Sequence, residues 1–241
     1  MTPPLKIRFY GKEIYHEADP WAGDPELTGA VKECVGAQKK AAAPLLQTIF
    51  SPNADASRQV SEDRLREILQ SEKAVNGIRT EKEISNVVVF NDRRYEKAVF
   101  STEISESRKR LDRLVTAYAS RLFEDEKGPF DIHSSGFFLY PPGGYMGWHT
   151  NWQNPGWRLY ISYAEEPGKS FFRYRDPETG QIVTSPDKGF HLRVFRATDE
   201  NPFWHAIYSE THRYSLGYKI ALLPKSFLGR LKRKIKRRLF L

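Results

Sequence analysis

The stretch RYSLGYKIAL, which runs from Arg213 to Leu222, has the residue alternation of a β-strand that separates two environments. Successive side chains along a strand point to opposite faces of its sheet. One face of this strand is wholly apolar and consists of Tyr214, Leu216, Tyr218, Ile220 and Leu222. The other face is small and polar and consists of Arg213, Ser215, Gly217, Lys219 and Ala221. The apolar face predicts packing in a core, and the polar face predicts the wall of a pocket.

Short strand-like runs of the same kind fill the chain between Pro129 and Arg213, where clusters of Gly, Pro and Asp separate them. The runs are Gly136–Tyr140, Arg158–Ala164, Ser170–Tyr174, Gln181–Thr184, Leu192–Ala197 and Trp204–Tyr208. Strands at this regular spacing, with turn residues between them, are typical of a small barrel or sandwich.

The part of the chain before this strand-rich region has a more helical pattern. Apolar residues recur at helical spacing from Ser105 to about Glu124, which predicts a support helix with one buried stripe. Ser61 is a suitable N-cap for a helix through about Ser71, and a short helix is expected from Ala41 to Phe50. The run NVVVF, residues 86–90, predicts a buried strand. The rest of residues 1 to 60 is expected to be irregular.

These patterns predict an α+β fold in three parts. Residues 1–125 are expected to form a mixed, largely helical region that packs on the core. Residues 126–224 are expected to form the strand-rich core, and residues 225–241 a basic tail. Hydrophobic residues make up 39% of the 241, which is enough for a core of this size.

The net charge of +8 is concentrated in the tail. After residue 224 the chain has eight basic residues and no acidic one, which leaves 30 basic against 30 acidic residues elsewhere. The neutral body argues against nucleic-acid binding by the core. The tail, KSFLGRLKRKIKRRLFL, repeats an apolar residue every four positions, at Phe227, Leu231, Ile235 and Leu239. A basic amphipathic segment fits an anionic membrane surface or an acidic partner, and a solvated terminus is the alternative.

The sequence also predicts the cellular location of the protein. The single cysteine, Cys34, excludes an internal disulfide and a cysteine-rich zinc site. The N-terminus lacks the apolar core of a signal peptide, and no apolar stretch reaches transmembrane length. We therefore expect a cytoplasmic protein, with the tail as a means of peripheral attachment to a membrane.

Two histidines lie near the ends of different predicted strands. His149 and His205 are 56 residues apart, a spacing that is natural across a barrel. Imidazole is a good ligand for iron, zinc or copper. Arg213 follows His205 by eight residues and Ser215 shares its strand face, so these two predict a clamp for a carboxylate. The ordinary alternatives are a stacked turn histidine, a salt bridge and a plain strand serine.

Two further arginines, Arg158 and Arg173, lie on predicted strands near these residues. Pairing with surface carboxylates is their expected role, and contact with an anionic substrate is the alternative. The tryptophans near the candidate ligands fit either a substrate mouth or core packing. They are Trp148, Trp152, Trp157 and Trp204.

The segment from Tyr140 to Leu222 resembles the Fe(II)/2-oxoglutarate-dependent oxygenases, most of all the prolyl-hydroxylase-type branch. The resemblance lies in YPPGGYMGWHTN, RLYISYAEEPGKSFF, VTSPDKGFHLRVF and HAIYSETHRYSLGYKI, in that order along the chain. The last piece is similar to the distal histidine and the Arg-X-Ser signature of that family. Residues 1–125 show no such match. The resemblance implies a double-stranded β-helix of the jelly-roll or cupin type, with support helices on its N-terminal side.

The resemblance also implies roles for individual residues. His149 and His205 would bind Fe(II). Arg213 and Ser215 would bind the far carboxylate of 2-oxoglutarate, and Tyr140 would hydrogen-bond this co-substrate. The implied enzyme is a dioxygenase that uses Fe(II), 2-oxoglutarate and O2 and releases succinate and CO2. Its substrate, a small molecule or a protein side chain, would most often be hydroxylated.

Asn151 departs from the family pattern, in which the third metal ligand is usually Asp or Glu. Its neutral amide oxygen is a poorer ligand for a divalent cation than a carboxylate. Three outcomes stay open. Asn151 binds the metal weakly beside His149 and His205; or water or a halide takes its place, as in a halogenase; or the site is inactive and the fold is a non-catalytic binding module. Glu165 and Glu210 are the carboxylates that would otherwise have to swing in.

Overall fold

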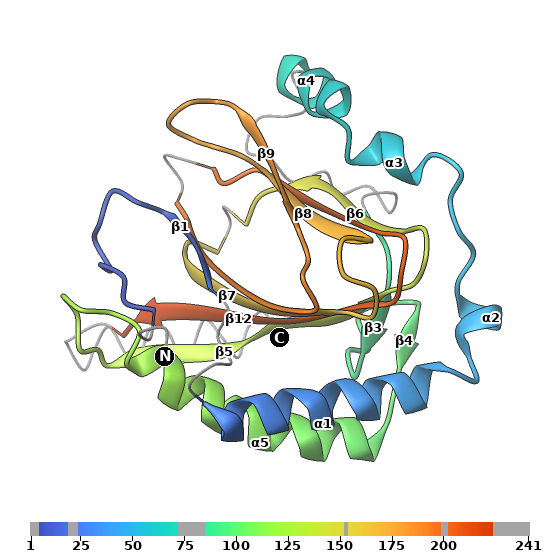
Figure 1. Cartoon of the computed structure of the whole chain (residues 1–241), viewed down its shortest axis with the longest axis horizontal. Coiled ribbons are helices and arrows are strands. Elements are labelled where there is room, and N and C mark those ends of the chain that lie inside the picture. Colours follow the sequence, from blue (N-terminus) through green and yellow to red (C-terminus); the bar gives the residue numbers. More distant parts are fainter. Residues whose placement is uncertain (1–4, 19–23, 72–84, 152–153, 199–201, 224–241) are drawn as a thin grey trace.

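The strands form two facing sheets in the computed structural model, which describes residues 5–18, 24–71, 85–151, 154–198 and 202–223 (Figure 1). The larger sheet has the order β1-β10-β7-β12-β5-β3-β4. Its strands are β1 (Tyr15–Ala18), β10 (Phe190–Ala197), β7 (Gly156–Ala164), β12 (Arg213–Leu222), β5 (Phe130–Tyr140), β3 (Val88–Phe90) and β4 (Ala98–Val99). The smaller sheet has the order β2-β6-β11-β8-β9. Its strands are β2 (Ser85–Asn86), β6 (Gly144–His149), β11 (His205–Ser209), β8 (Ser170–Arg175) and β9 (Ile182–Pro186).

The order in which the chain visits the sheets identifies a double-stranded β-helix. From β5 onward the chain crosses from the larger sheet to β6, back to β7, and across again to β8 and β9. It then returns to β10, crosses to β11 and ends on β12. All pairs within this core are antiparallel. The expectation of a jelly-roll core in an α+β fold is therefore confirmed, and each strand predicted after Pro129 is present.

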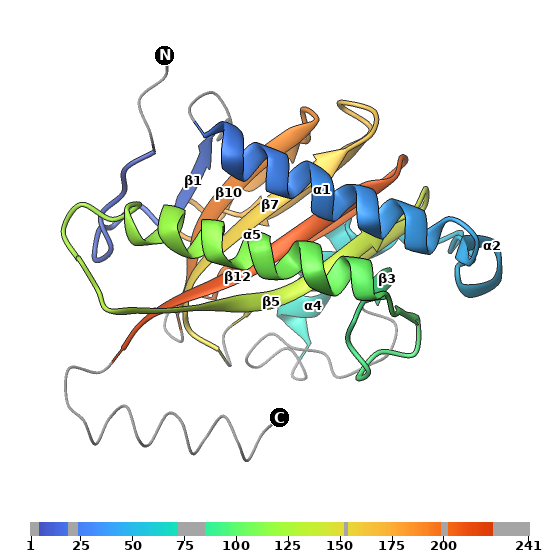
Figure 2. The same cartoon turned by 90° about the horizontal axis from the view of Figure 1, so that it is seen from below.

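Two long helices cover the outer face of the larger sheet (Figure 2). They are α1 (Pro25–Ala42) and α5 (Thr102–Ser120). The main apolar cluster joins both helices to the sheet, with Cys34 and Leu111 among the buried helix residues and Tyr214 and Leu216 among those of β12. The face of β12 that was predicted to pack in a core does so. The first 125 residues also supply β1, β2, β3 and β4, which extend the two sheets.

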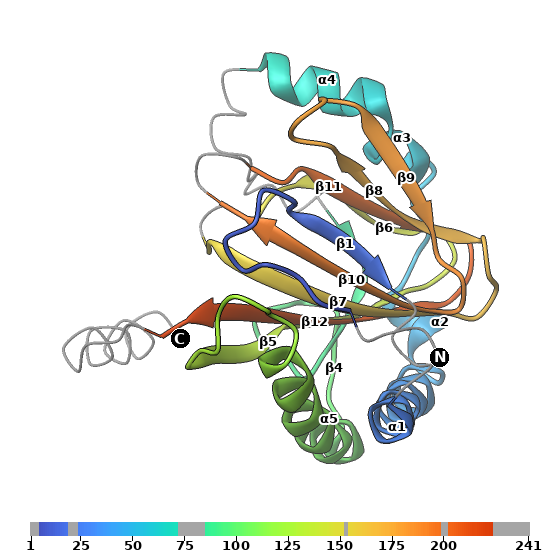
Figure 3. The ribbon, with the colours of Figure 1, turned by 60° about the vertical axis from the view of Figure 1, so that its left-hand side comes forward.

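Smaller helices cover the outer face of the smaller sheet (Figure 3). They are α3 (Ala56–Gln59) and α4 (Glu62–Gln70), and α2 (Leu46–Ile49) precedes them. Trp148 and Trp204 pack in the apolar cluster beneath α3 and α4, and the Trp148 indole donates to the carbonyl oxygen of Ser61 at 2.7 Å. Trp157 packs in the main cluster. These three tryptophans are core residues, while Trp152 lies outside the described residues.

The helix predictions for the N-terminal half were partly wrong. The region expected to be irregular contains α1, an 18-residue helix in which Asp24 caps Leu27 N and Pro25 follows at the first position. Half of its eight buried residues are alanine or cysteine, which give little hydrophobic contrast in the sequence. The helix expected at 41–50 is divided between the end of α1 and the separate α2.

The remaining predictions for this half need only small corrections. The Ser61 cap is confirmed, because its hydroxyl accepts from Arg64 N at 3.1 Å. The support helix begins earlier than expected, at its cap Ser101, and ends at Ser120. Residues 86–90 are all buried, as expected, although they are divided between β2 and β3. No helix in the described ranges is long and apolar enough to cross a membrane. The basic tail, residues 225–241, lies outside the described residues.

Candidate functional site

The two candidate metal ligands face each other across two neighbouring strands. His149 is the last residue of β6 and His205 the first of β11, and the antiparallel register places them directly opposite. Their ring centroids are 4.0 Å apart, with an interplanar angle of 50°. The fold therefore brings together two histidines that are 56 positions apart in the sequence.

Backbone carbonyls fix the tautomer of both rings. His149 Nδ1 lies 2.8 Å from the carbonyl oxygen of Gly147, and His205 Nδ1 lies 2.9 Å from that of Phe203. A carbonyl oxygen can only accept, so each Nδ1 carries the proton and each Nε2 retains its lone pair. Orientation of this kind, by a partner on the other ring nitrogen, is usual for metal-binding histidines.

Burial keeps both rings neutral. It lowers the pKa of His149, and it lowers the pKa of His205 further, with a smaller contribution from the neighbouring His149. A neutral imidazole with an accessible Nε2 lone pair is the form that binds a metal. The donor set of the pair thus fits a divalent cation.

The Asn151 side chain lies beside the histidine pair. Its side-chain amide nitrogen lies 3.5 Å from Nε2 of His205. A half-turn of the amide puts the carbonyl oxygen there instead, which would make it a neutral oxygen ligand beside two imidazoles. Within the described residues, no group of three or more His, Cys, Asp and Glu side chains could hold a metal. Glu165 pairs with Lys39 at 2.8 Å and Glu210 lies 3.8 Å from Lys169, so both alternative carboxylates are engaged elsewhere.

Arg213 is buried and partly engaged. Its Nε donates to Oδ2 of Asp187 at 2.8 Å, so the salt-bridge interpretation is correct for one face of the guanidinium. Its Nη1 is buried and has no hydrogen-bond partner among the described residues. Asp187 also accepts from Arg193 Nη1 at 2.6 Å and from the hydroxyls of Ser162 and Ser170. Burial opposes ionisation of Asp187, but the two guanidinium groups and these hydrogen bonds outweigh it and hold its pKa well below the usual value.

Tyr140 and Ser215 lie on the same wall as Arg213. Tyr140 is directly opposite Arg213 in the register of β5 and β12, and the guanidinium carbon lies 5.1 Å from the centre of its ring. Burial raises the pKa of Tyr140, so its phenol stays protonated and can donate a hydrogen bond. Ser215 is buried two positions along β12 and faces the same way. The three residues predicted to bind a co-substrate are therefore neighbours.

Asp187 and Arg193 are site residues that sequence analysis missed. Asp187 sits in the sequence SPDKG, which has the composition of an ordinary turn. The available signal was in β10, where Arg193 alternates with Leu192 and Val194, two members of the main apolar cluster. A charged residue on the inner face of a strand needs a buried partner, and such a partner was not sought.

The expectation of pairing with surface carboxylates is wrong for Arg158. Arg173 does lie at an outer face, but it too has no carboxylate ion-pair partner among the described residues. Arg158 is only 2% exposed, and it forms no ion pair with a carboxylate in the part of the chain that the structure describes. Arg173 is half-buried at the outer face and donates to Thr184 Oγ1 and to the carbonyl oxygen of Val60, each at 2.8 Å. Strand alternation explains the difference, because Arg158 shares its face with Tyr160 and Ser162 and points between the sheets.

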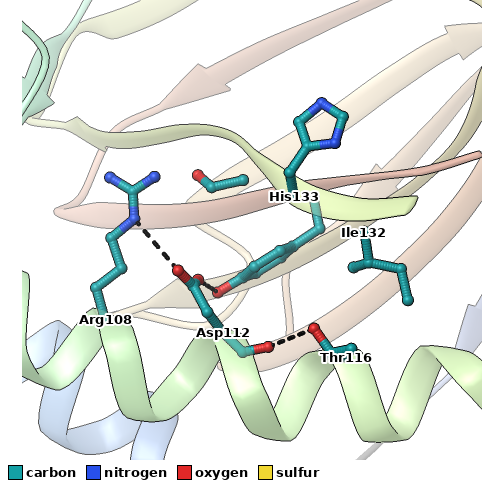
Figure 4. Close-up of a pocket in the computed structure, with 7 residues that line it drawn as sticks. Arg108, Asp112, Thr116, Ile132 and His133 are labelled. Atoms are coloured by element: carbon teal, nitrogen blue, oxygen red, sulfur yellow. Dashed lines mark hydrogen bonds and ion pairs between the residues drawn. The ribbon is translucent and has the colours of Figure 1, made fainter. Parts of the chain in front are cut away.

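A separate cavity of about 310 Å³ lies between α5 and the outer face of the larger sheet (Figure 4). Asp112 is at its centre, where it accepts from Tyr218 Oη at 2.9 Å and lies 3.9 Å from Arg108. This cavity is on the helix-covered face and includes none of the predicted site residues. Tyr218, Arg108 and Thr116 all contact Asp112, so three of its polar side chains are already engaged.

Comparison with known proteins gives structural likenesses only. No family model matches the chain, and no curated protein matches its sequence. It is similar to a prolyl hydroxylase from Trichoplax adhaerens in complex with a hypoxia inducible factor oxygen degradation domain peptide fragment, with 15% identity over 92% of this chain and 87% of that one and a TM-score of 0.47. It is similar to a Pseudomonas putida prolyl-4-hydroxylase, with 13% identity, coverage of 88% and 94%, and a TM-score of 0.44. A 2OG-Fe(II) oxygenase family protein from Burkholderia pseudomallei has 13% identity, coverage of 91% and 95%, and a TM-score of 0.40.

Proposed function

We propose that this protein is a non-haem Fe(II)- and 2-oxoglutarate-dependent oxygenase that hydroxylates its substrate and releases succinate and CO2. The observation that carries the proposal is the histidine pair. His205 is buried and His149 half-buried, the two rings are neutral and directly opposite, and both Nδ1 atoms are bonded to backbone carbonyls. Two lone pairs of this kind, on rings whose centroids are 4.0 Å apart and which have no acidic partner among the described residues, suit metal binding better than structural packing.

The residues around the pair fit Fe(II) with open coordination positions. Asn151 would supply a third, neutral oxygen ligand, so the protein ligands would leave the charge of the cation undiminished until a dianionic co-substrate arrives. When bound, iron supplies the oxygen chemistry, in which 2-oxoglutarate is oxidised to succinate and CO2. The chain itself orients the ligands through Gly147 and Phe203 and excludes water with the aromatic residues between the sheets.

Arg213 is the proposed anchor for the far carboxylate of 2-oxoglutarate. Asp187 holds the guanidinium through Nε, which leaves Nη1 to donate to a ligand. The Ser215 hydroxyl and the protonated Tyr140 phenol would supply the further hydrogen bonds that a carboxylate accepts. Removing a donor from such a buried charged contact weakens binding strongly.

The test is an anaerobic titration of the full chain with Fe(II) and 2-oxoglutarate. We expect a weak metal-to-ligand charge-transfer band in the visible range, and succinate formation once air is admitted. His149→Ala should abolish both, whereas Arg173→Gln, at the outer face, should leave both intact. A flat spectrum together with no succinate would exclude the proposed activity.

Asn151 favours one second candidate, a non-catalytic binding module on the same fold. The discriminating variant is Asn151→Asp. If this variant binds iron and turns over 2-oxoglutarate while the parent protein binds none, the binding module is correct. If the substitution only impairs the parent, Asn151 belongs to the working site. A halogenase is disfavoured because Asn151 is long enough to place its side-chain amide 3.5 Å from Nε2 of His205, where a halogenase of this type has a residue too small to reach a metal. A chloride-dependent product would reverse this ranking.

A further inference from the structure

Arg158 is a buried cation that has no carboxylate partner among the described residues. It is 2% exposed and lies on β7. Its neighbours Trp157 and Leu159 belong to the main apolar cluster beneath the helices. Because strand side chains alternate, Arg158 points the other way, into the space between the sheets. That is also the space into which the histidine pair faces.

The hydrogen bonds of Arg158 do not neutralise it. Its two Nη atoms donate to the backbone carbonyl oxygens of Asn154 and Trp157. Its Nε is buried and has no acceptor in the described part of the chain. Two other buried arginines in the described ranges, Arg193 and Arg213, share the carboxylate of Asp187. A guanidinium is always charged, and a buried charge without a partner is costly. Among these three arginines, Arg158 is the one that has no carboxylate partner in the described part of the chain.

The register places Arg158 away from the proposed 2-oxoglutarate anchor. On the paired strands β7 and β12, Arg158 is opposite Lys219, whereas Arg213 is opposite Ala164. The two positions are six residues apart, which is about 20 Å along a strand. A five-carbon diacid held at Arg213 therefore does not account for Arg158 as well.

Arg158 is instead next to the segment that carries Asn151. This segment joins β6 to β7, and Asn154, whose carbonyl oxygen accepts from Arg158, closes a turn on the Asn151 carbonyl oxygen at 3.0 Å. Lys219 adds a second cationic group, since its Nζ lies 3.4 Å from Asn154 Oδ1. Two basic side chains thus flank the end of the sheets at which the histidine pair lies.

We propose that Arg158 binds an oxyanion of the substrate, a carboxylate or a phosphate, beside the histidine pair and apart from the co-substrate anchor at Arg213. The proposal rests on the proposed function, because it takes the bound molecule to be the substrate of that oxygenase. It assigns that molecule to a chemical class: an anionic compound, or a peptide with an acidic residue next to the reacting position. The unengaged Nε–H, together with an adjacent Nη–H, presents the planar fork that such groups accept.

The test uses the full-length protein without iron or 2-oxoglutarate, so it is independent of the oxygenase assay. Inorganic phosphate and acetate are titrated separately at constant ionic strength against chloride, and binding is measured by isothermal titration calorimetry. We expect saturable binding of at least one probe by the parent protein. Arg158→Gln should weaken it about tenfold or more. Which probe binds distinguishes a phosphate group from a carboxylate group.

Two further variants separate binding from support of the fold. Arg196→Gln is the matched control, because Arg196 bonds the Phe9 carbonyl oxygen from the helix-covered face and should keep the parent affinity. Arg158→Lys keeps the charge without the fork and should weaken binding less than Arg158→Gln; it also replaces that variant if glutamine prevents folding. Equal anion binding by the parent protein and the folded Arg158 variants would overturn the proposal, as would the absence of saturable binding to the parent. A missing charge-transfer band with intact anion binding would instead refute only the oxygenase.

Discussion

Asp187 is the residue whose replacement tests the buried charge network most directly. Its side chain is completely buried and accepts from Arg193 at 2.6 Å, from Arg213 at 2.8 Å, and from two serine hydroxyls. Asp187→Asn keeps the shape and removes the charge. Both guanidinium groups then stay buried without this carboxylate, and the new amide nitrogen points a donor at one of them.

The expected loss of stability is large. Breaking a buried ion pair by removing one partner costs about 3–5 kcal/mol, out of a total of about 5–15 kcal/mol for a typical domain. For a chain of this length, that loss lowers the Tm by roughly 10 °C. Asp112→Asn is the matched control. The Asp112 side chain is 42% exposed, and its carboxylate is as far as 3.9 Å from Nε of Arg108. Removing its charge should therefore cost less than about 1 kcal/mol of stability.

The stability lost in Asp187→Asn should also depend on pH, and it should shrink as the pH falls. The pKa of Asp187 in the folded protein lies far below its ordinary value of 3.8. Its contribution to stability is therefore complete above the unfolded pKa and is lost as the pH falls toward the folded one. The difference in unfolding free energy between the parent and Asp187→Asn should be constant above about pH 5. Below pH 3.8 it should narrow by about 1.4 kcal/mol per pH unit.

Urea unfolding at a series of pH values from 7 to 2.5, followed by tryptophan fluorescence, measures this difference. A loss below about 1 kcal/mol at pH 7 would contradict the buried network. So would a difference between parent and variant that stays the same from pH 5 to pH 2.5. Either result would mean that Asp187 does not hold the two arginines as described.

Three further predictions concern other parts of the chain. Gly29→Ala should raise the free energy of unfolding by about 0.5–1 kcal/mol, because Gly29 is exposed within α1 and an added Cβ meets nothing within 4 Å; thermal unfolding that shows a loss would contradict this. Gly144→Ala should lower stability by about 1–3 kcal/mol, because its Cβ would lie 2.8 Å from the carbonyl oxygen of Pro141 and 2.9 Å from Tyr140 Cα; a neutral effect in the same assay would show that the turn adapts. Arg213→Gln should raise the KM for 2-oxoglutarate about 100-fold or more while Fe(II) binding to the histidine pair persists; an unchanged KM would remove Arg213 from the co-substrate site.

The strand-rich half could be predicted from the sequence because alternation reports environment directly. The apolar face of β12 packs under α1 and α5 as the pattern requires. The same rule applied to β7 predicts apolar residues at 157, 159 and 161 and a mixed face at 158, 160 and 162. Arg158, on that mixed face, was expected to pair with surface carboxylates, although it points between the two sheets. Polarity alone does not distinguish the wall of an internal site from a wet surface.

The parts that could not be predicted depend on contacts between distant segments. Helix α1 has small buried residues such as Ala30 and Cys34, so its stripe is recognisable only against α5 and the sheet. Asp187 is in a turn by composition, and its role depends on two arginines from other strands. The order of His149, His205 and Arg213 was readable along the chain, whereas the way in which Asp187 divides the donors of Arg213 was not.

The support of the histidine pair has a consequence for how this chain tolerates mutation. Both Nδ1 partners are main-chain carbonyls, of Gly147 and Phe203, and each lies two residues before its histidine on the same segment. Where a carboxylate side chain orients a ligand, a single substitution removes it. Here a substitution at either supporting position leaves the acceptor atom in place. The orientation of the two rings is therefore inherited with the path of the backbone, and it can persist while the surrounding side chains drift over evolutionary time.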